Sequence, residues 1–255
     1  MAIKPKPVRV AVALAAALLA VTGCSSPTAS TGGTGSAGTL VVATAGEPDT
    51  LNPVLNYGVD GASLIFDGLV ARDARNELVP ALARELPTVS ADGKTVTAKL
   101  REGVLFHDGS PLTAQDVVFT YQAVLDPAVD STLRSDLDML ASVTAPDPGT
   151  VVFTLQYAYA PFLQRLALGI VPAKAFAGQD VNKAGFNRKP VGTGPYRFTS
   201  WTPGDRLVLA ANETYWGGKP ANSGVVVAFV ADDNVRAQRM RAGEFDAAEL
   251  APKLA

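Results

Sequence analysis

Hydrophobic and polar positions in residues 92–121 follow two different periods in succession, and the rest of the chain is organised around this stretch. In its first part apolar residues alternate with polar ones, which is the period of a half-buried strand. The apolar residues of that strand are Val96, Ala98 and Leu100. Turns are predicted on either side, at Asp92-Gly93 and Asp108-Gly109, because glycine accepts the positive φ that many tight turns require.

The second part of the stretch has the helical period. Thr113 is a candidate N-cap, and Asp116 follows three residues later, which is close to a capping box. The apolar residues after Thr113 fall on one helical face, and they are Val117, Val118, Tyr121, Val124 and Leu125. The pattern therefore predicts a capped amphipathic helix.

Runs of apolar and β-branched residues between turn residues predict further strands. They lie at 39–43, 140–145, 151–156, 196–201, 206–211 and 225–230. The middle four are expected to form two hairpins, and the last run is apolar throughout, as in a strand covered on both faces. Helices are expected at 63–69, at 161–168 and from Asp232 or Asp233 to Ala242, where Gly243 can end the helix.

Composition places the chain among globular proteins. Of its 255 residues, 47% are hydrophobic and 18% are charged. The formal charge is −2, and it becomes −5 when Lys4, Lys6 and Arg9 are left out as part of a segment that export would remove. A nucleic-acid partner is excluded, because it requires a basic surface that displaces counterions.

The first 24 residues have the pattern of an export signal. A basic start precedes the apolar run 10–20, which is shorter than the roughly 20 residues of a membrane span and fits the core of a signal peptide. Small residues then precede Cys24, as in a bacterial lipobox. We therefore expect a signal peptide at 1–23, followed at 24–38 by a flexible tether of small uncharged residues. The alternative is a plain signal peptide with an incidental cysteine.

Three segments carry a resemblance to a known family. They are LREGVLFHDGSPLTAQDVVFTY at 100–121, PVGTGPYRFTSWTPGDRLVLAANETYWGGKP at 190–220 and, more weakly, RAGEFDAAEL at 241–250. In amino-acid sequence and in order they resemble the segments of family 5 of the extracellular solute-binding proteins, which serve dipeptide, oligopeptide and nickel ABC importers. The resemblance covers essentially everything after residue 38.

The resemblance implies an α/β fold, a lobe of the type II periplasmic-binding-protein class with an inserted α/β subdomain. Lobe I would take residues 39–69 and 172–255, and the subdomain would take 70–171. Family members are considerably longer, so the second lobe is expected to be missing from this chain, which we interpret as an N-terminal fragment or a truncated product. The resemblance also implies that Cys24 is lipidated, which would anchor an exported monomer to the outer face of the membrane beside an ABC permease; the alternative location is the periplasm.

The family's peptide-binding members present extended backbone to the ligand after the turn that corresponds to Asn52-Pro53. Matching by position, the resemblance implies that Tyr57, Gly58 and Val59 lie on a strand at the ligand cleft. Leu133 matches a position that reaches toward the ligand in the oligopeptide group. These four residues are the candidate ligand-binding residues. The aromatic residues further along, among them Trp201 and Trp216, are expected to pack in the core.

Catalytic chemistry finds little support in the sequence. His107 is the only histidine and Cys24 the only cysteine, which excludes a zinc site of the usual kind and any intramolecular disulfide. The motifs G-x-S-x-G and S-x-x-K do not occur, so no catalytic residue, metal or cofactor is predicted. Alternatives to peptide capture are another solute such as a nickel chelate or an oligosaccharide, a secreted hydrolase with a carboxylate pair, or a truncated chain without transport activity.

Overall fold

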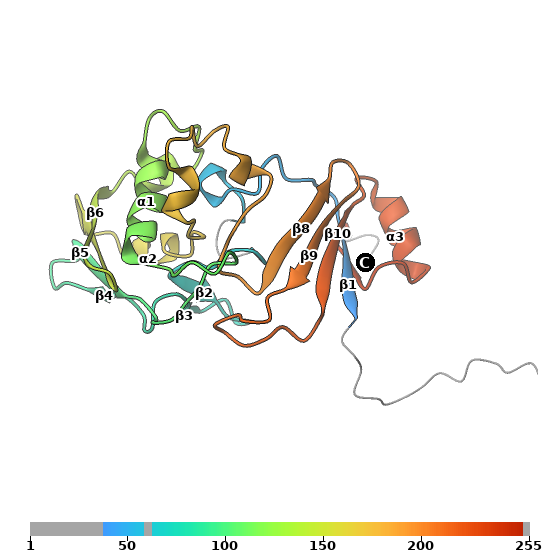
Figure 1. Cartoon of the computed structure of the whole chain (residues 1–255), viewed down its shortest axis with the longest axis horizontal. Coiled ribbons are helices and arrows are strands. Elements are labelled where there is room, and N and C mark those ends of the chain that lie inside the picture. The colour runs from blue at the N-terminus through green and yellow to red at the C-terminus, as the bar shows by residue number, and fades with distance from the viewer. Residues whose placement is uncertain (1–37, 59–62, 252–255) are drawn as a thin grey trace, which may run out of the picture. The chain divides into compact units, whose positions relative to one another are not determined.

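The computed structural model describes residues 38–58 and 63–251. Its first element is β1 (Thr39–Thr44), which lies inside a five-stranded sheet of order β11–β1–β10–β9–β8 (Figure 1). The other strands of this sheet are β8 (Tyr196–Thr202), β9 (Arg206–Ala211), β10 (Gly224–Phe229) and β11 (Ala247–Ala248). β1 pairs in parallel with both β10 and β11, whereas β10, β9 and β8 pair antiparallel.

A second sheet has the order β4–β5–β7–β6 and is antiparallel throughout. Its strands are β4 (Thr88–Val89), β5 (Thr95–Lys99), β6 (Leu140–Asp147) and β7 (Thr150–Leu155). The hairpin of β2 (Val70–Arg72) and β3 (Leu78–Pro80) stands apart from both sheets. The first sheet thus takes its strands from 39–44 and 196–248, and the second from 88–155. The exact domain boundaries stay a prediction.

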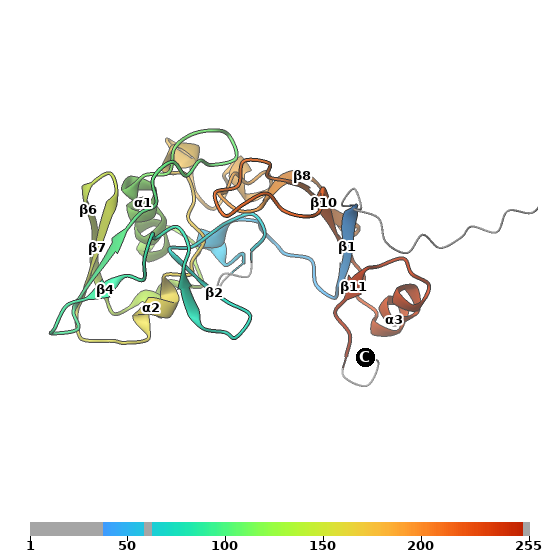
Figure 2. The ribbon, with the colours of Figure 1, turned by 90° about the horizontal axis from the view of Figure 1, so that it is seen from below.

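Helix α1 (Ala114–Leu125) covers one face of the second sheet (Figure 2). Tyr121 is fully buried, and its ring lies edge-on to Phe153 of β7 at 5.0 Å between centroids. Phe153 in turn contacts Phe162 of α2 (Phe162–Arg165) at 5.4 Å. The predicted amphipathic helix is therefore confirmed, and its apolar face supplies the core between helix and sheet.

The remaining helices are short, apart from α3 (Asp233–Arg241), which Asp232 caps by accepting a hydrogen bond from Val235 N at 2.9 Å. The 3-10 helices are η1 (Pro53–Leu55), η3 (Arg134–Leu137), η4 (Ala173–Phe176) and η5 (Gly185–Asn187). In the part of the chain that the structure describes, no helix has the length and hydrophobicity that a membrane crossing requires.

Most of the predicted local structure is confirmed. All six further strands form, and both turn glycines have positive φ, 70° at Gly93 and 83° at Gly109. Strand β5 buries Val96 and Ala98 as its alternation predicts. The helix predicted at 161–168 is present but shorter, as α2.

The helix predicted at 63–69 is wrong, because the backbone of that segment bonds to distant parts of the chain. Ile65 O accepts from Gly194 N at 2.9 Å, and Leu69 N donates to Leu166 O at 2.8 Å. A Cβ on Gly192 would lie 2.0 Å from Ile65 O, so only glycine allows this close approach. These long-range contacts replace the bonds that a helix would make within itself.

Two other expectations also need correction. Strand β10 is not covered on both faces, because its residues from Val226 to Phe229 are only half-buried. Tyr57 and Gly58 do not lie on a strand. They follow η1 in a turn, in which Asn52 Oδ1 accepts from Val54 N at 3.0 Å and Asn52 O accepts from Tyr57 N at 3.1 Å.

Candidate ligand-binding groove

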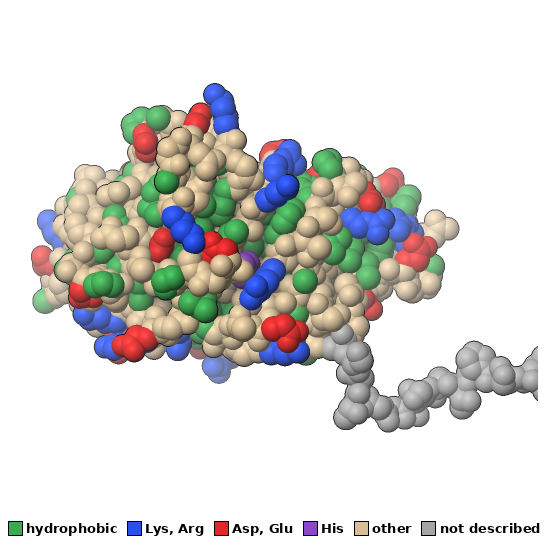
Figure 3. All heavy atoms as spheres, in the orientation of Figure 1, with side chains coloured by type: hydrophobic (Ala, Val, Ile, Leu, Met, Phe, Trp, Pro, Cys, Tyr) green, Lys and Arg blue, Asp and Glu red, His purple; other side chains and the backbone are tan. Residues whose placement is uncertain are grey.

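An open groove of about 480 Å³ lies where the parallel strands β1 and β10 end. In open sheets with parallel strands, ligands bind beyond the carboxyl ends of the strands, because the loops that leave them diverge there. The wall of the groove is mainly apolar, and Figure 3 shows hydrophobic side chains gathered over the five-stranded sheet on one face of the molecule. The apolar side chains that line it include Pro48, Tyr57, Leu207, Val227 and Phe229.

Two carboxylates, Glu47 and Glu249, also line the groove, and among the residues that the structure describes no Lys or Arg does. Glu47 belongs to the loop that leaves β1, and both of its oxygens are engaged. Oε1 accepts from Trp201 Nε1 at 2.7 Å, and Oε2 accepts from Gly204 N at 2.7 Å. Glu47 therefore ties the loop after β1 to the hairpin of β8 and β9.

Trp201 was expected to pack in the core, and the structure gives it a second role. Its indole is half-exposed and packs partly against the core, but its N–H holds Glu47. The Arg188 guanidinium lies over the indole ring, 4.0 Å from the centroid. An arginine so placed is attracted to the face of the ring. Trp201 thus links the five-stranded sheet to the charged side chains of Glu47 and Arg188.

Tyr57 reaches the groove from the turn after η1. Its ring meets Phe66 edge-on at 6.3 Å, which fixes its position from the core side. Burial raises the pKa of the Tyr57 phenol to about 12. The hydroxyl therefore stays protonated at neutral pH and can donate a hydrogen bond.

Leu133 lies in a different cavity, of about 170 Å³, between η1, η3 and α2. Asn56 also lines this cavity, and an ion pair of Arg165 with Asp136 at 3.2 Å crosses its wall. The Arg165 carbonyl accepts from the buried Tyr121 hydroxyl at 2.9 Å, so α1 holds the wall in place. Apolar and polar side chains both line this second cavity.

The structure therefore does not bring the four predicted site residues into one pocket. Tyr57 lines the groove, and Leu133 lines the second cavity. The two sites are adjacent in sequence at Asn56, which lines the cavity, and Tyr57. Gly58 lines neither and has a φ of 59°. Val59 and the lipid-attachment residue Cys24 lie outside the described residues. The ligand-binding roles stay predictions.

Sequence reasoning passed over the two glutamates of the groove. Glu47 was not among the candidate ligand-binding residues. One signal could have singled it out, because Glu47 follows β1 directly and the loop beyond a parallel strand is where ligands bind. Nothing local marks Glu249, which enters the groove through the pairing of β11 with β1.

His107 has a structural place, as its turn position suggested. Its Nδ1 accepts from Gly192 N at 3.3 Å, which leaves Nε2 as the donor to Gly194 O at 2.9 Å. Burial lowers the pKa of the imidazole, so the neutral ring with both nitrogens bonded is the favoured form. Within residues 38–58 and 63–251, no group of three or more His, Cys, Asp or Glu residues is arranged to hold a metal ion.

The family model of the bacterial extracellular solute-binding proteins, family 5 middle, matches residues 77–255. The chain belongs to this family. Protein XP55 of Streptomyces lividans is 53% identical over 251 residues, which are 98% of this chain and 46% of that protein. Di/tripeptide-binding protein 2 of Pseudomonas aeruginosa is 35% identical over 84% of this chain and 45% of that protein.

Solved structures of solute-binding proteins agree with this assignment. NikZ from Campylobacter jejuni, in complex with Ni(L-His), matches with a TM-score of 0.80 at 30% identity, over 85% of this chain and 44% of that one. The oligopeptide-binding protein AppA from Bacillus subtilis, in complex with a nonapeptide, matches with a TM-score of 0.78 at 30% identity, over 84% and 44%. The chain spans about half the length of the relatives it matches, which fits one lobe with its subdomain.

Proposed function

We propose that the chain is the solute-capturing part of an ABC importer and that its solutes are peptides. The observation that carries this proposal is the groove at the carboxyl ends of β1 and β10, with its apolar wall and two carboxylates. A peptide offers apolar side chains to such a wall and backbone N–H groups, with a terminal ammonium, to the carboxylates. Main-chain hydrogen bonds with an extended peptide would give affinity that depends little on its sequence.

The mechanism is capture and release without covalent chemistry. A second lobe would close over the groove, and the solute would favour the closed state by binding it more tightly than the open one. The closed monomer would then deliver the solute to a permease in the membrane. A secreted hydrolase with a carboxylate pair is the opposing class, and it would consume the solute that a binding protein returns intact.

Calorimetry with a pool of di- to pentapeptides on a two-lobed version of the protein tests this proposal, followed by chromatography of the recovered peptides. Binding with intact recovery supports capture. Cleavage of the peptides identifies a hydrolase, and absence of binding rejects peptides as the solute.

A nickel chelate is the second candidate, favoured by the similarity to NikZ, whose solved complex holds Ni(L-His). A metal that arrives with its own organic ligand needs few ligands from the protein, which fits a groove whose acids, among the described residues, are Glu47 and Glu249. Titration with Ni(L-His) and with L-His alone separates this candidate from the peptides. Heat released with Ni(L-His) and not with L-His would select the chelate.

We further propose that Cys24 carries a lipid and tethers the exported protein to the membrane. The support is the sequence pattern before Cys24 and the small uncharged residues after it. Several acyl chains give stable attachment, since each buried CH₂ contributes about 0.8 kcal/mol. Fractionation of a bacterial host should find the wild type in the membrane fraction and Cys24→Ser soluble or unprocessed. Exported wild type in the soluble fraction would reject the anchor.

A further inference from the structure

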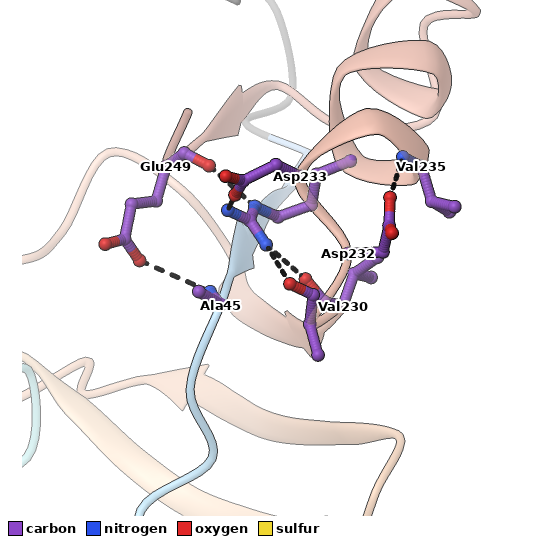
Figure 4. Close-up of polar contacts among 8 residues, drawn as sticks. Ala45, Val230, Asp232, Asp233, Val235 and Glu249 are labelled. Atoms are coloured by element: carbon purple, nitrogen blue, oxygen red, sulfur yellow. Dashed lines mark hydrogen bonds and ion pairs between the residues drawn. The ribbon is translucent and has the colours of Figure 1, made fainter. Parts of the chain in front are cut away.

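Helix α3 turns the guanidinium of Arg236 into the interior beside the groove. Arg236 is 1% exposed. Its Nε donates to Glu249 O at 2.6 Å, and its other nitrogens bond to Val230 O, to Ala231 O at 3.2 Å and to the Asp233 carboxylate (Figure 4). One side chain thus holds carbonyls from the segments that follow β10 and β11.

Those same segments hold the end of β1, the strand between β10 and β11. Val230 N donates to Thr44 O at 2.9 Å, and Glu249 N donates to Ala43 O at 2.9 Å. Beyond the last strand pair, the Glu249 side chain continues the ladder, since its Oε2 accepts from Ala45 N at 3.2 Å. Ala45 and Glu249 both line the groove. On one side of β1 Arg236 therefore bonds to Glu249, which lines the groove, and on the other side it bonds to Val230, which follows the lining residue Phe229.

Packing alone does not explain why residue 236 is an arginine. A buried guanidinium loses its hydration, and a hydrophobic side chain of similar volume often stabilises a fold as well or better. Arg236 has one carboxylate partner, Asp233, whose side chain is 41% exposed. The planar guanidinium has N–H donors that point in fixed directions. It can therefore bond several carbonyls at set positions, which a lysine ammonium cannot reproduce.

We propose that Arg236 is a positioning residue of the groove. It fixes the ends of β10 and β11, and through Glu249 it sets where the loop after β1 leaves the sheet. That loop carries Glu47, so the bond from Trp201 to Glu47 depends on the same arrangement. The inference rests on the proposed function for its meaning in binding, but the positioning itself can be measured without any solute.

The first measurement is amide hydrogen exchange by NMR on the mature protein, for wild type, Arg236→Met, Arg236→Lys and the control Arg241→Met. Arg241 lies on the same helix and is exposed. In Arg236→Met we expect exchange at Ala45 to rise by about tenfold or more while Phe153 in the second sheet keeps its protection, because the opening is local. The Trp201 indole N–H resonance should shift in the same variant. Arg236→Lys should show the same changes, and Arg241→Met neither.

Glu249→Leu covers the case in which Arg236→Met does not fold, since it removes the acceptor of Ala45 N from the surface. It should raise exchange at Ala45 in the same way. Unchanged exchange at Ala45 in folded Arg236→Met or Arg236→Lys, or an equal rise at Ala45 and Phe153 in either, would overturn the positioning role. The second result would mean that Arg236 only stabilises the fold.

Calorimetry with tri-alanine on the same variants, each extended by a second lobe, gives the second measurement. If Arg236 positions the groove, Arg236→Lys should weaken tri-alanine binding by about tenfold, and Arg241→Met should leave it unchanged. Unaltered affinity in Arg236→Lys, with faster exchange at Ala45, would overturn the link to the groove. If the wild type itself binds no tri-alanine, the proposed function fails for this peptide, while the exchange data still decide the positioning role.

Discussion

Asp67 joins three parts of the chain through one carboxylate. Oδ1 accepts from the Tyr215 hydroxyl at 3.0 Å, and Oδ2 accepts from Trp216 Nε1 at 2.8 Å and from the Thr193 hydroxyl at 3.1 Å. Burial raises the pKa of the carboxyl, although these hydrogen bonds oppose the shift. Trp216 was expected to pack in the core, and Asp67 is the partner that holds its indole N–H.

Removing the Asp67 carboxylate should therefore destabilise the fold strongly. We expect Asp67→Ala to lower the free energy of unfolding by about 2–4 kcal/mol, since each buried donor left unpaired costs about 1–3 kcal/mol and water can reach part of the site. Asp67→Asn keeps one acceptor and should cost less. Urea unfolding measures both, with Glu102→Ala as a control at an exposed acid. Equal midpoints for Asp67→Ala and the control would contradict the network.

His107 should make stability depend on pH. Because burial lowers its pKa in the folded state, the unfolded chain binds a proton more readily. Stability is thus complete above the unfolded pKa of about 6.5 and falls as the pH drops toward the folded pKa. It is the only histidine in the chain, so His107→Asn should remove this fall between about pH 6.5 and 5.

The raised pKa of Asp67 acts in the opposite direction, because its stabilising effect is present at low pH and is lost as the pH rises. Chemical unfolding across this pH range should therefore be repeated in the Asp67→Asn background. If the same fall in stability persists in the double variant with Asp67→Asn and His107→Asn, groups other than these two cause it.

At the scale of elements, the N-terminus of α1 depends more on Asp116 than on the Thr113 hydroxyl. Asp116 is 8% exposed, and its Oδ2 accepts from Thr113 N and from the Thr113 hydroxyl, each at 2.9 Å. Its Oδ1 accepts from Ala173 N at 2.9 Å, which attaches the helix to η4. The capping box predicted for Thr113 and Asp116 is present, and the Thr113 hydroxyl in addition donates to the Asp116 carboxylate.

The loss of stability in cap variants should therefore be larger at Asp116 than at Thr113. Thr113→Ala should cost about 1 kcal/mol and Thr113→Ser much less, because serine keeps the hydroxyl. Asp116→Ala should cost more, about 2–3 kcal/mol, since it also leaves the part-buried Ala173 N–H without its partner. Urea unfolding of the three variants gives the comparison. A Thr113→Ala variant less stable than Asp116→Ala would show that the hydroxyl carries the cap.

Elements were predictable where their signals are local. Alternation marks β5, spacing marks α1, and Asp-Gly pairs mark their turns, so each was found from a few neighbouring residues. The segment 63–69 failed because its bonds go to Leu166 and Gly194, about a hundred or more residues away. The groove escaped prediction for the same reason, since only the parallel pairing of β1 with β10 and β11 brings Glu249 to Ala45.

At the scale of the whole molecule, the groove has a wall on one side only within the described residues. Val227 and Phe229, which line it, are half-buried. The match to 44–46% of the length of related proteins fits a single lobe with its subdomain. A single wall leaves polar contacts in water, where they are weak, while an extended peptide still loses its conformational freedom on binding.

Residues 1–255 alone are therefore expected to bind peptides weakly or not measurably. A version that continues into a second lobe should bind at least about a hundredfold more tightly, because closure removes water from both sides of the ligand. Calorimetry with di- to pentapeptides on both proteins makes the comparison, with circular dichroism to establish that the shorter chain is folded. Micromolar or tighter binding by the 255-residue chain would contradict the need for a second lobe, and would mean that the groove beside Tyr57 and Glu249 is sufficient by itself.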